Sequence, residues 1–280
     1  MRCDSHVHIV GPRDRYPQLE TRTYIARVAP LETLQRVAAA RGISRFVIVQ
    51  PSFYGNDNTV LLETLDALGG LGRAVAVIHP SASPAMLSDY ARRGVRGLRI
   101  NVYSPMRDRE FQRFDDFVTA MARIAQPLGW HVEVIAAIAT LAGNADVLAA
   151  AAVPVVIDHY GLHGRSLPDS AEGERLLDLL RLPHVWIKLS APYRLSDDYM
   201  STRPSKAWLA AIVAAAAERC VWGSDWPHTP QHGLMTDGSI ELPYRALSYE
   251  QLVDDFIAAL PSRDLVEPIM TDNPGRLYGF

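Results

Sequence analysis

The sequence predicts an α/β protein, a single (β/α)8 or TIM barrel over residues 1–280. Its length of 280 residues suits such a barrel, which takes about 250 residues as one domain. Eight short runs rich in β-branched residues alternate with helical segments, as is typical of parallel strands joined by helices. A doubly wound open sheet is the alternative, and it is disfavoured because no Gly-x-Gly-x-x-Gly follows the first strand.

Each predicted strand is a short apolar run, and each predicted helix is amphipathic or rich in alanine. In chain order, the strands are expected at Cys3–Val10, Arg45–Gln50, Arg73–His79, Gly97–Asn101, Trp130–Ile135, Val153–Asp158, His184–Leu189 and Cys220–Asp225. The helices are expected at Leu31–Arg41, Asn58–Leu68, Ala85–Arg93, Phe111–Gln126, Glu172–Leu180 and Lys206–Glu218. Three of these helices are followed by a glycine (Gly42, Gly69 and Gly94), which readily adopts the left-handed conformation found after a helix.

Long segments follow the first, sixth and eighth strands, at Gly11–Pro30, Tyr160–Ala171 and Trp226–Ser248. In a barrel these segments all emerge at the C-terminal face, where active sites of this fold lie. Trp226–Ser248 is rich in proline and glycine, and we expect it to act as a lid.

Composition excludes several functional classes. Lysine and arginine total 28 against 31 acidic residues, a net charge of −3, so the chain has no basic excess for a nucleic-acid partner. The longest apolar runs, Trp208–Ala217 and Leu148–Ile157, fall short of the ~20 residues of a membrane helix. Cys3 and Cys220 are too few for a disulfide scaffold, and strand material at Cys3 leaves no room for a signal peptide. We expect a cytoplasmic enzyme; the oligomeric state is not determined.

The first strand carries a His-x-His pair. Asp4, His6 and His8 share one face of the strand, and the apolar residues between them must face the surrounding helices. The two histidines therefore point into the barrel near its C-terminal end, where imidazoles bind a metal ion or polarise a carbonyl group. Two purely structural histidines are the alternative, which is disfavoured because burying polar rings costs free energy.

Two further strands end in ionisable residues. The eighth strand ends at Asp225, and the first and last strands are neighbours in a closed barrel. Asp225 is therefore expected beside His6 and His8, where it accepts a proton from water. The sixth strand ends in Asp158 and His159, either of which could be the inward residue. A structural role as a loop cap is the alternative for Asp225.

Arginines also lie at the predicted barrel mouth. Arg99 and Asn101 share a face of the fourth strand, and Arg194 follows the seventh. A guanidinium group in this position needs an anion, either a protein carboxylate or an acidic substrate. His228 follows Asp225 closely and could reach over the pocket.

Five segments together resemble the amidohydrolase superfamily, of the amidohydrolase 2 type, and more narrowly its 2-pyrone-4,6-dicarboxylate lactonase-like branch. The segments are Asp4-Ser5-His6-Val7-His8, Val49-Gln50-Pro51-Ser52 with Gly55 and Asp57-Asn58, Gly97–Asn101, Ile157-Asp158-His159-Tyr160-Gly161, and Trp222–His228. The C-terminal Asp272–Phe280 is also similar to that group, so the resemblance spans nearly the whole chain.

The resemblance implies a distorted (β/α)8 barrel that hydrolyses a carbon–oxygen or carbon–nitrogen bond. It implies that Asp225 activates water while histidines polarise a lactone carbonyl and hold the oxyanion, and that arginines bind a substrate carboxylate. The predicted catalytic residues are Asp225, His6, His8 and His159. The predicted substrate-binding residues are Arg99, Arg194, Tyr16, Ser52, Asn101 and His228.

A metal ion is not favoured. Metal-dependent relatives usually place a lysine on the fourth strand or a histidine after the fifth, whereas this chain has Arg99 and, as a possible oxygen donor, only Glu133. Zinc or manganese remains an alternative, with His6, His8 and Asp225 as the ligands. Lys188 on the seventh strand can face Asp225, in either a structural or a catalytic role, and the role of Glu133 is left open as well.

The chain departs from the lactonase pattern at two positions. Ile135 stands where the branch has a tyrosine, and Leu162 where it has an arginine. A second substrate carboxylate is therefore in doubt unless Arg107, Arg109 or Arg165 binds it. The expected substrate is a carboxylated lactone of the 2-pyrone dicarboxylate, muconolactone or sugar-acid type, or a sulfonated analogue. The alternatives are a zinc or manganese amidohydrolase or decarboxylase, a lactone isomerase and, least favoured, a non-catalytic protein that binds small acids.

Overall fold

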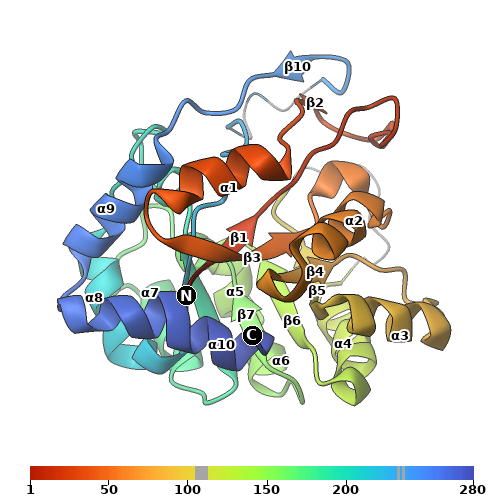
Figure 1. Ribbon diagram of the computed structural model, residues 1–280. Helices are drawn as coiled ribbons and strands as arrows, with labels where there is room; N and C mark the ends of the chain where they lie inside the picture. Colours follow the sequence, from red (N-terminus) through yellow and green to blue (C-terminus); the bar gives the residue numbers. More distant parts are fainter. Residues whose placement is uncertain (105–112, 232–233, 235–236) are drawn as a thin grey trace.

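Eight parallel strands form one sheet that curves into a barrel (Figure 1). The computed structural model describes residues 1–104, 113–231, 234 and 237–280. The strands are β1 (Arg2–Val7), β3 (Ile43–Val49), β4 (Gly72–Ala76), β5 (Val95–Asn101), β6 (His131–Ile135), β7 (Val155–Ile157), β8 (Val185–Ser190) and β9 (Cys220–Gly223), paired in that order. The predicted barrel is therefore confirmed, although several strands end earlier than expected. Val10, for example, already pairs with Ala29 of the following loop.

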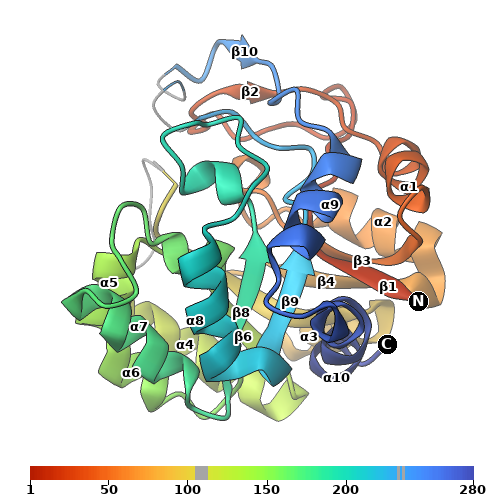
Figure 2. The same cartoon turned by 90° about the vertical axis from the view of Figure 1, so that its left-hand side faces the viewer.

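Helices cover the outside of the barrel (Figures 1 and 2). They are α1 (Leu31–Ala39), α2 (Thr59–Leu68), α3 (Pro84–Arg93), α4 (Phe114–Ala125), α5 (Ile138–Gly143), α6 (Ala145–Ala149), α7 (Ala171–Leu180), α8 (Lys206–Ala216), α9 (Tyr249–Ala259) and α10 (Asn273–Tyr278). The six predicted helices are present; α5, α6, α9 and α10 were not predicted. Within the described ranges, no helix is both long and apolar enough to span a membrane.

The seam between β1 and β9 closes the barrel. The backbone N–H of Asp225 donates to the carbonyl of His6 at 2.9 Å, and that of His8 donates to the carbonyl of Trp226 at 2.8 Å. Gly223 permits this approach, because a Cβ atom at that position would lie 2.6 Å from the Cβ of His6. The last strand and the first therefore meet where the sequence placed the candidate base and the histidines.

Asp4 holds this seam together from inside. Its Oδ1 accepts hydrogen bonds from the backbone N–H groups of Ser224 at 2.9 Å and His6 at 3.2 Å. Its Oδ2 accepts one from the hydroxyl of Tyr249, on α9, at 2.8 Å. Burial raises the pKa of the Asp4 carboxyl to about 6. One carboxyl group thus connects β1, the end of β9 and an outer helix.

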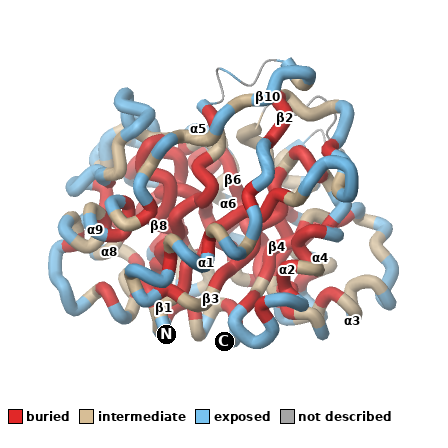
Figure 3. The backbone as a smooth tube through the Cα atoms, turned by 45° about the horizontal axis from the view of Figure 1, so that its top comes forward, coloured by how far each residue is buried: buried red, intermediate tan, exposed pale blue. Residues whose placement is uncertain are grey.

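The loops after the first and last barrel strands pair above the C-terminal face. Their short strands β2 (Ile25–Ala26) and β10 (Glu241–Leu242) run parallel, at the top of Figures 1 and 2. The strands below are buried, whereas much of this upper layer is exposed (Figure 3). This pairing was not predicted; it gives the described part of Trp226–Ser248 a fixed partner in the loop that precedes α1.

Candidate active site

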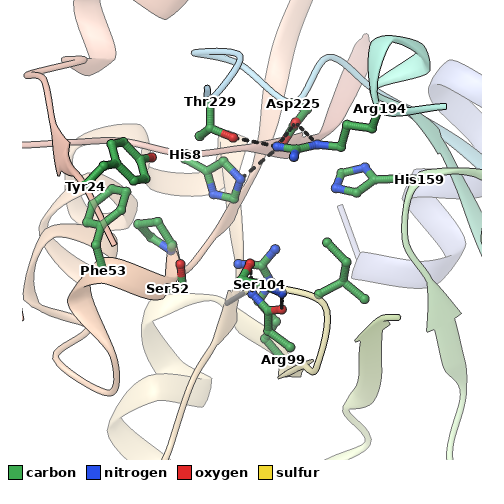
Figure 4. A pocket seen from close by; sticks show the side chains of 13 residues that line it. His8, Tyr24, Ser52, Phe53, Arg99, Ser104, His159, Arg194, Asp225 and Thr229 are labelled. Atoms are coloured by element: carbon green, nitrogen blue, oxygen red, sulfur yellow. Dashed lines mark hydrogen bonds and ion pairs between the residues drawn. The ribbon is translucent and has the colours of Figure 1, made fainter. Parts of the chain in front are cut away.

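A cavity at the C-terminal ends of the strands brings most of the predicted site residues together (Figure 4). Its walls include the predicted residues His8, Ser52, Arg99, Asn101, His159, Arg194 and Asp225. Five further wall residues were not predicted for the site: Tyr24, Pro51, Phe53, Ser104 and Thr229. Ile135, one of the two departures from the lactonase pattern, also lines the cavity. The cavity combines a carboxylate, two imidazoles and two guanidinium groups with an apolar side formed by rings and an isoleucine.

Asp225 is fully buried and surrounded by donors. Its Oδ2 accepts hydrogen bonds from the Tyr193 hydroxyl at 2.6 Å and from Nε and Nη2 of Arg194 at 3.0 and 2.8 Å. Its Oδ1 lies 3.2 Å from Nε2 of His8 and 3.6 Å from Nε2 of His6. The imidazoles and the guanidinium therefore contact opposite oxygens of one carboxylate.

These neighbours keep Asp225 ionised. Burial alone would raise the pKa of the carboxyl, but the Arg194 guanidinium, and with it the hydrogen bond to His8, holds that pKa well below its usual range. A carboxylate that stays charged at neutral pH can accept a proton from water.

His8 and His159 occupy two walls of the cavity. Nδ1 of His8 lies 2.7 Å from the carbonyl of Val49, and Nε2 lies 3.2 Å from Oδ1 of the Asp225 carboxylate. Both partners can only accept, so each of these hydrogen bonds needs a proton on the ring nitrogen that makes it. Nδ1 of His159 lies 2.8 Å from the Ser190 hydroxyl. Burial lowers the pKa of His159 to about 4, which leaves it a neutral imidazole at neutral pH.

His6 lies beneath Asp225 and is not part of the cavity wall. Its Nδ1 lies 3.2 Å from Nζ of Lys188 and 3.3 Å from Oδ1 of Asp158. Burial and the neighbouring Lys188 ammonium hold the pKa of His6 well below its usual range. Lys188 itself contacts Glu133, with Nζ 2.5 Å from Oε2, so these two residues form a buried pair below the site.

The two arginines of the cavity have different partners. Arg194 bonds Asp225 and also donates to the Thr229 hydroxyl at 2.6 Å. Arg99 donates through Nη1 to the carbonyl of Gln50 at 2.7 Å, and its Nε has no hydrogen-bond partner within the described part of the chain. The sequence analysis left two possible anions for these guanidinium groups, a protein carboxylate or an acidic substrate. Arg194 binds a protein carboxylate, that of Asp225.

Two predicted binding residues lie away from the cavity wall. The hydroxyl of Tyr16 donates to Glu63 at 2.5 Å, and a different tyrosine of the same loop, Tyr24, lines the cavity. His228 is buried against the ring of Tyr193 and lines a separate cavity beside α1. No repeating pattern in the loop after β1 distinguishes Tyr24 from Tyr16, so sequence reasoning had no signal with which to find it.

Of the three loop arginines considered for a second substrate carboxylate, the structure describes Arg165, which does not line the cavity. Arg165 is exposed and pairs with Asp197 at 3.0 Å. Arg107 and Arg109 lie outside the residues that the structure describes.

The backbone is strained where the site residues leave their strands. Asp225 has a φ of 58° and His159 a φ of 50°. Tyr160, which follows His159, and Ala191, which precedes Pro192–Arg194, also lie in the left-handed region. Residues other than glycine rarely adopt this conformation, and such residues cluster at functional sites. Tertiary contacts therefore hold both side chains in directions that the local chain disfavours.

Two groups of donors could hold a metal ion by proximity. One comprises His6, His8 and Asp225, and the other His6, Asp158 and His159; within each group the donor atoms lie within 4.8 Å of one another. The first is the ligand group that the sequence suggested. Both depend on His6, so the protonation of its ring decides whether either group is complete.

The chain matches one family model, and it is similar to named relatives and to solved structures. The sequence model of a family described as Amidohydrolase matches residues 3–280. A 4-sulfomuconolactone hydrolase of Hydrogenophaga intermedia is 30% identical over 283 residues, covering 99% of this chain and 88% of that protein. A 2-pyrone-4,6-dicarboxylate hydrolase of Comamonas testosteroni is 30% identical, covering 98% and 89%. A solved structure from Pseudomonas putida, named for 2-pyrone-4,6-dicarboxylic acid hydrolase, is 29% identical with a TM-score of 0.81, covering 99% and 97%.

Proposed function

The chain belongs to the amidohydrolase family, and we propose that it is a hydrolase of small carboxylated lactones. The resemblance to this family and to its lactonase-like branch, inferred from five sequence segments, is confirmed. The observation that carries the proposal is the position of Asp225, an ionised carboxylate on the cavity wall with His8 3.2 Å from one oxygen and Arg194 2.8 Å from the other.

Asp225 acts as the general base in this proposal. It takes a proton from a water molecule, and the resulting hydroxide attacks the lactone carbonyl carbon. His8 and His159, both on the cavity wall, stabilise the oxyanion that forms. The carbon–oxygen bond of the ring then breaks, leaving a carboxylic acid and an alkoxide, which takes the proton held by Asp225. His6, beneath Asp225, supports the base.

The substrate is held by its anionic group. Arg99 has an Nε without a hydrogen-bond partner within the described ranges, and Ser52 and Asn101 line the same cavity. Tyr24 and Ile135 offer an apolar surface for the lactone ring. The relatives named for sulfomuconolactone and pyrone dicarboxylate support a lactone that carries an acidic substituent.

We propose that hydrolysis needs no metal ion. Two arginines on the cavity wall supply positive charge, and His6, which both candidate ligand groups require, lies beneath Asp225 and away from that wall. Metal analysis of the purified protein and activity after chelation test this. Stoichiometric zinc or manganese, with activity lost on stripping and restored by the metal, would favour the metal-dependent alternative.

Asp225→Asn tests the proposed base. The asparagine cannot accept the proton, so we expect turnover of the best substrate in a lactone panel, read by acid release at neutral pH, to fall by at least about 10³-fold. The fold should be retained by circular dichroism. Asp66→Asn, at an exposed surface pair, is the matched control. Near-normal activity of Asp225→Asn would reject the assignment, and a product without label from ¹⁸O-water would indicate isomerisation.

A further inference from the structure

A layer of buried charges lies below the cavity, and the proposed chemistry does not use it. Lys188 and Glu133 are fully buried, and their charged atoms are 2.5 Å apart. Asp158, also buried, lies 3.8 Å from Lys188. Lys188 is one of two lysines in the chain, and it projects from β8 into the barrel interior beneath His6. Burying such charges costs free energy unless they are paired, and the contact that Lys188 makes with His6 suggests what the layer does.

The contact between Lys188 and His6 determines which ring nitrogen carries the proton. An ammonium group has only donors, so at 3.2 Å it requires a lone pair on Nδ1 of His6. In a neutral imidazole the proton then resides on Nε2, the nitrogen that faces Oδ1 of Asp225 at 3.6 Å. At this distance the contact is not a hydrogen bond, and Nε2 has no hydrogen-bond partner within the described part of the chain.

We propose that Lys188 is a positioning residue that fixes His6 in the Nε2–H form. In this form the Nε2–H of His6 faces Oδ1 of Asp225 at 3.6 Å, and the one lone pair of the ring, on Nδ1, is occupied by the Lys188 ammonium and is not free to bind a metal ion. The two proximity-defined metal groups are then incomplete, because both require His6. The residues present therefore do not fit a bound metal ion. The consequence for catalysis rests on the proposed function, but the tautomer itself does not.

Asp158 is the competitor for the same ring nitrogen. Its Oδ1 lies 3.3 Å from Nδ1 of His6, and neither of its oxygens has a hydrogen-bond partner among the described residues. Without Lys188, the ring proton would move to Nδ1 and face this carboxylate. Nε2 would then turn a lone pair toward the same space as His8 and Asp225, which completes a three-ligand site for zinc.

Nitrogen-15 NMR of the histidine rings tests the tautomer in the unaltered protein. The chain has nine histidines, and the signal missing from His6→Gln identifies His6. We expect Nε2 to give the shift of a protonated ring nitrogen and Nδ1 that of an unprotonated one. A proton on Nδ1, or on both nitrogens, would overturn the proposal, whatever the enzyme hydrolyses.

Zinc binding tests the role of Lys188. The variant Lys188→Met/Glu133→Gln removes both charges of the closest buried pair together, and Asp158 retains the Arg99 guanidinium 3.9 Å away. By equilibrium dialysis we expect it to bind zinc at least about tenfold more tightly than the unaltered protein. Adding His6→Gln should abolish the gain, and Lys206→Met, at an exposed lysine, should show none.

Equal zinc affinity of the folded double variant and the unaltered protein would contradict the assignment of Lys188. Circular dichroism establishes whether the double variant folds, and if it does not, the NMR result on the unaltered protein decides the question. Neither measurement uses turnover, so a failure here is distinguishable from a failure of the lactonase proposal.

Discussion

At the scale of single residues, the two oxygens of the Asp225 carboxylate have different partners. One oxygen of Asp225 accepts hydrogen bonds from Arg194 and Tyr193, and the other lies 3.2 Å from Nε2 of His8. Arg99 stands apart from this group, and its nearest carboxylate, Asp158, is 3.9 Å away. The proposed base and the proposed anion-binding residue can therefore be altered independently.

Arg99→Met should weaken substrate binding more than it slows the chemical step. A hydrogen bond to a charged group contributes about 1.5–3 kcal/mol, so KM for a carboxylated lactone should rise by roughly 10–100-fold, with a smaller effect on kcat. Steady-state kinetics with the carboxylated lactone and its methyl ester measure this, and the ester should lose little. Arg165→Met, at an exposed arginine, is the control. An unchanged KM would mean that Arg99 has a structural role only.

At the scale of elements, the contact between β1 and β9 brings Asp225 close to His6 and His8. These strands share no continuous ladder; a few backbone bonds and the Asp4 carboxylate join them. Asp225 and His8 both lie just beyond this seam. A change that separates the two strands should therefore affect stability and activity together.

Gly223→Ala should widen the seam. The new Cβ would lie 2.6 Å from the Cβ of His6 and 2.9 Å from its backbone nitrogen, so the two strands must shift. We expect the free energy of unfolding in urea to fall by about 1–3 kcal/mol, with activity reduced as well. Gly70→Ala is the control, since a Cβ at that position would have no neighbouring atom within 4 Å. Unchanged stability of Gly223→Ala would show that the strands are not in close contact.

Tyr249→Phe should weaken the attachment of α9 to the barrel. It removes the hydroxyl that donates to Oδ2 of Asp4 at 2.8 Å and leaves a buried acceptor without that donor. The expected cost is about 1–3 kcal/mol in the free energy of unfolding, measured by urea denaturation. Tyr199→Phe, at an exposed tyrosine, should cost little by comparison. Equal effects of the two variants would show that the hydrogen bond from Tyr249 to Asp4 does not stabilise the contact between β1 and β9.

At the scale of the whole molecule, buried histidines make stability depend on pH. Burial lowers the pKa of His159, His163 and His228 to about 4, whereas unfolded histidine titrates near pH 6.5. Between these values the unfolded chain binds more protons, so stability is full above about pH 6.5 and falls as the pH decreases toward 4. Asp4 acts in the opposite direction, because its pKa is raised to about 6. Burial also lowers the pKa of His6 and His131, which adds to the effect of the three histidines.

His163→Gln should reduce this acid sensitivity without touching the site. His163 stacks on Trp208, with ring centroids 4.7 Å apart, and lies outside the cavity wall. The slope of unfolding free energy against pH between 6 and 4.5 should become shallower by up to about 1.4 kcal/mol per pH unit. Urea denaturation across that range measures it, with exposed His79→Gln as the control. An unaltered slope would mean that His163 is protonated in the folded protein.

The sequence by itself determined the barrel and which side chains meet at the centre of the candidate site. Alternation along β1 placed His6 and His8 inside, and the adjacency of first and last strands placed Asp225 beside them. These predictions succeeded because period-two alternation and strand order depend on local pattern and chain connectivity.

Only the tertiary structure decided the rest. Tyr24, and not Tyr16, lines the cavity, and Arg194 binds Asp225. Lys188 contacts Glu133 and His6. Alternation specifies the face of a strand on which a side chain emerges. It does not specify where a long, flexible side chain ends or which loops pack together, because those depend on contacts between segments far apart in the chain.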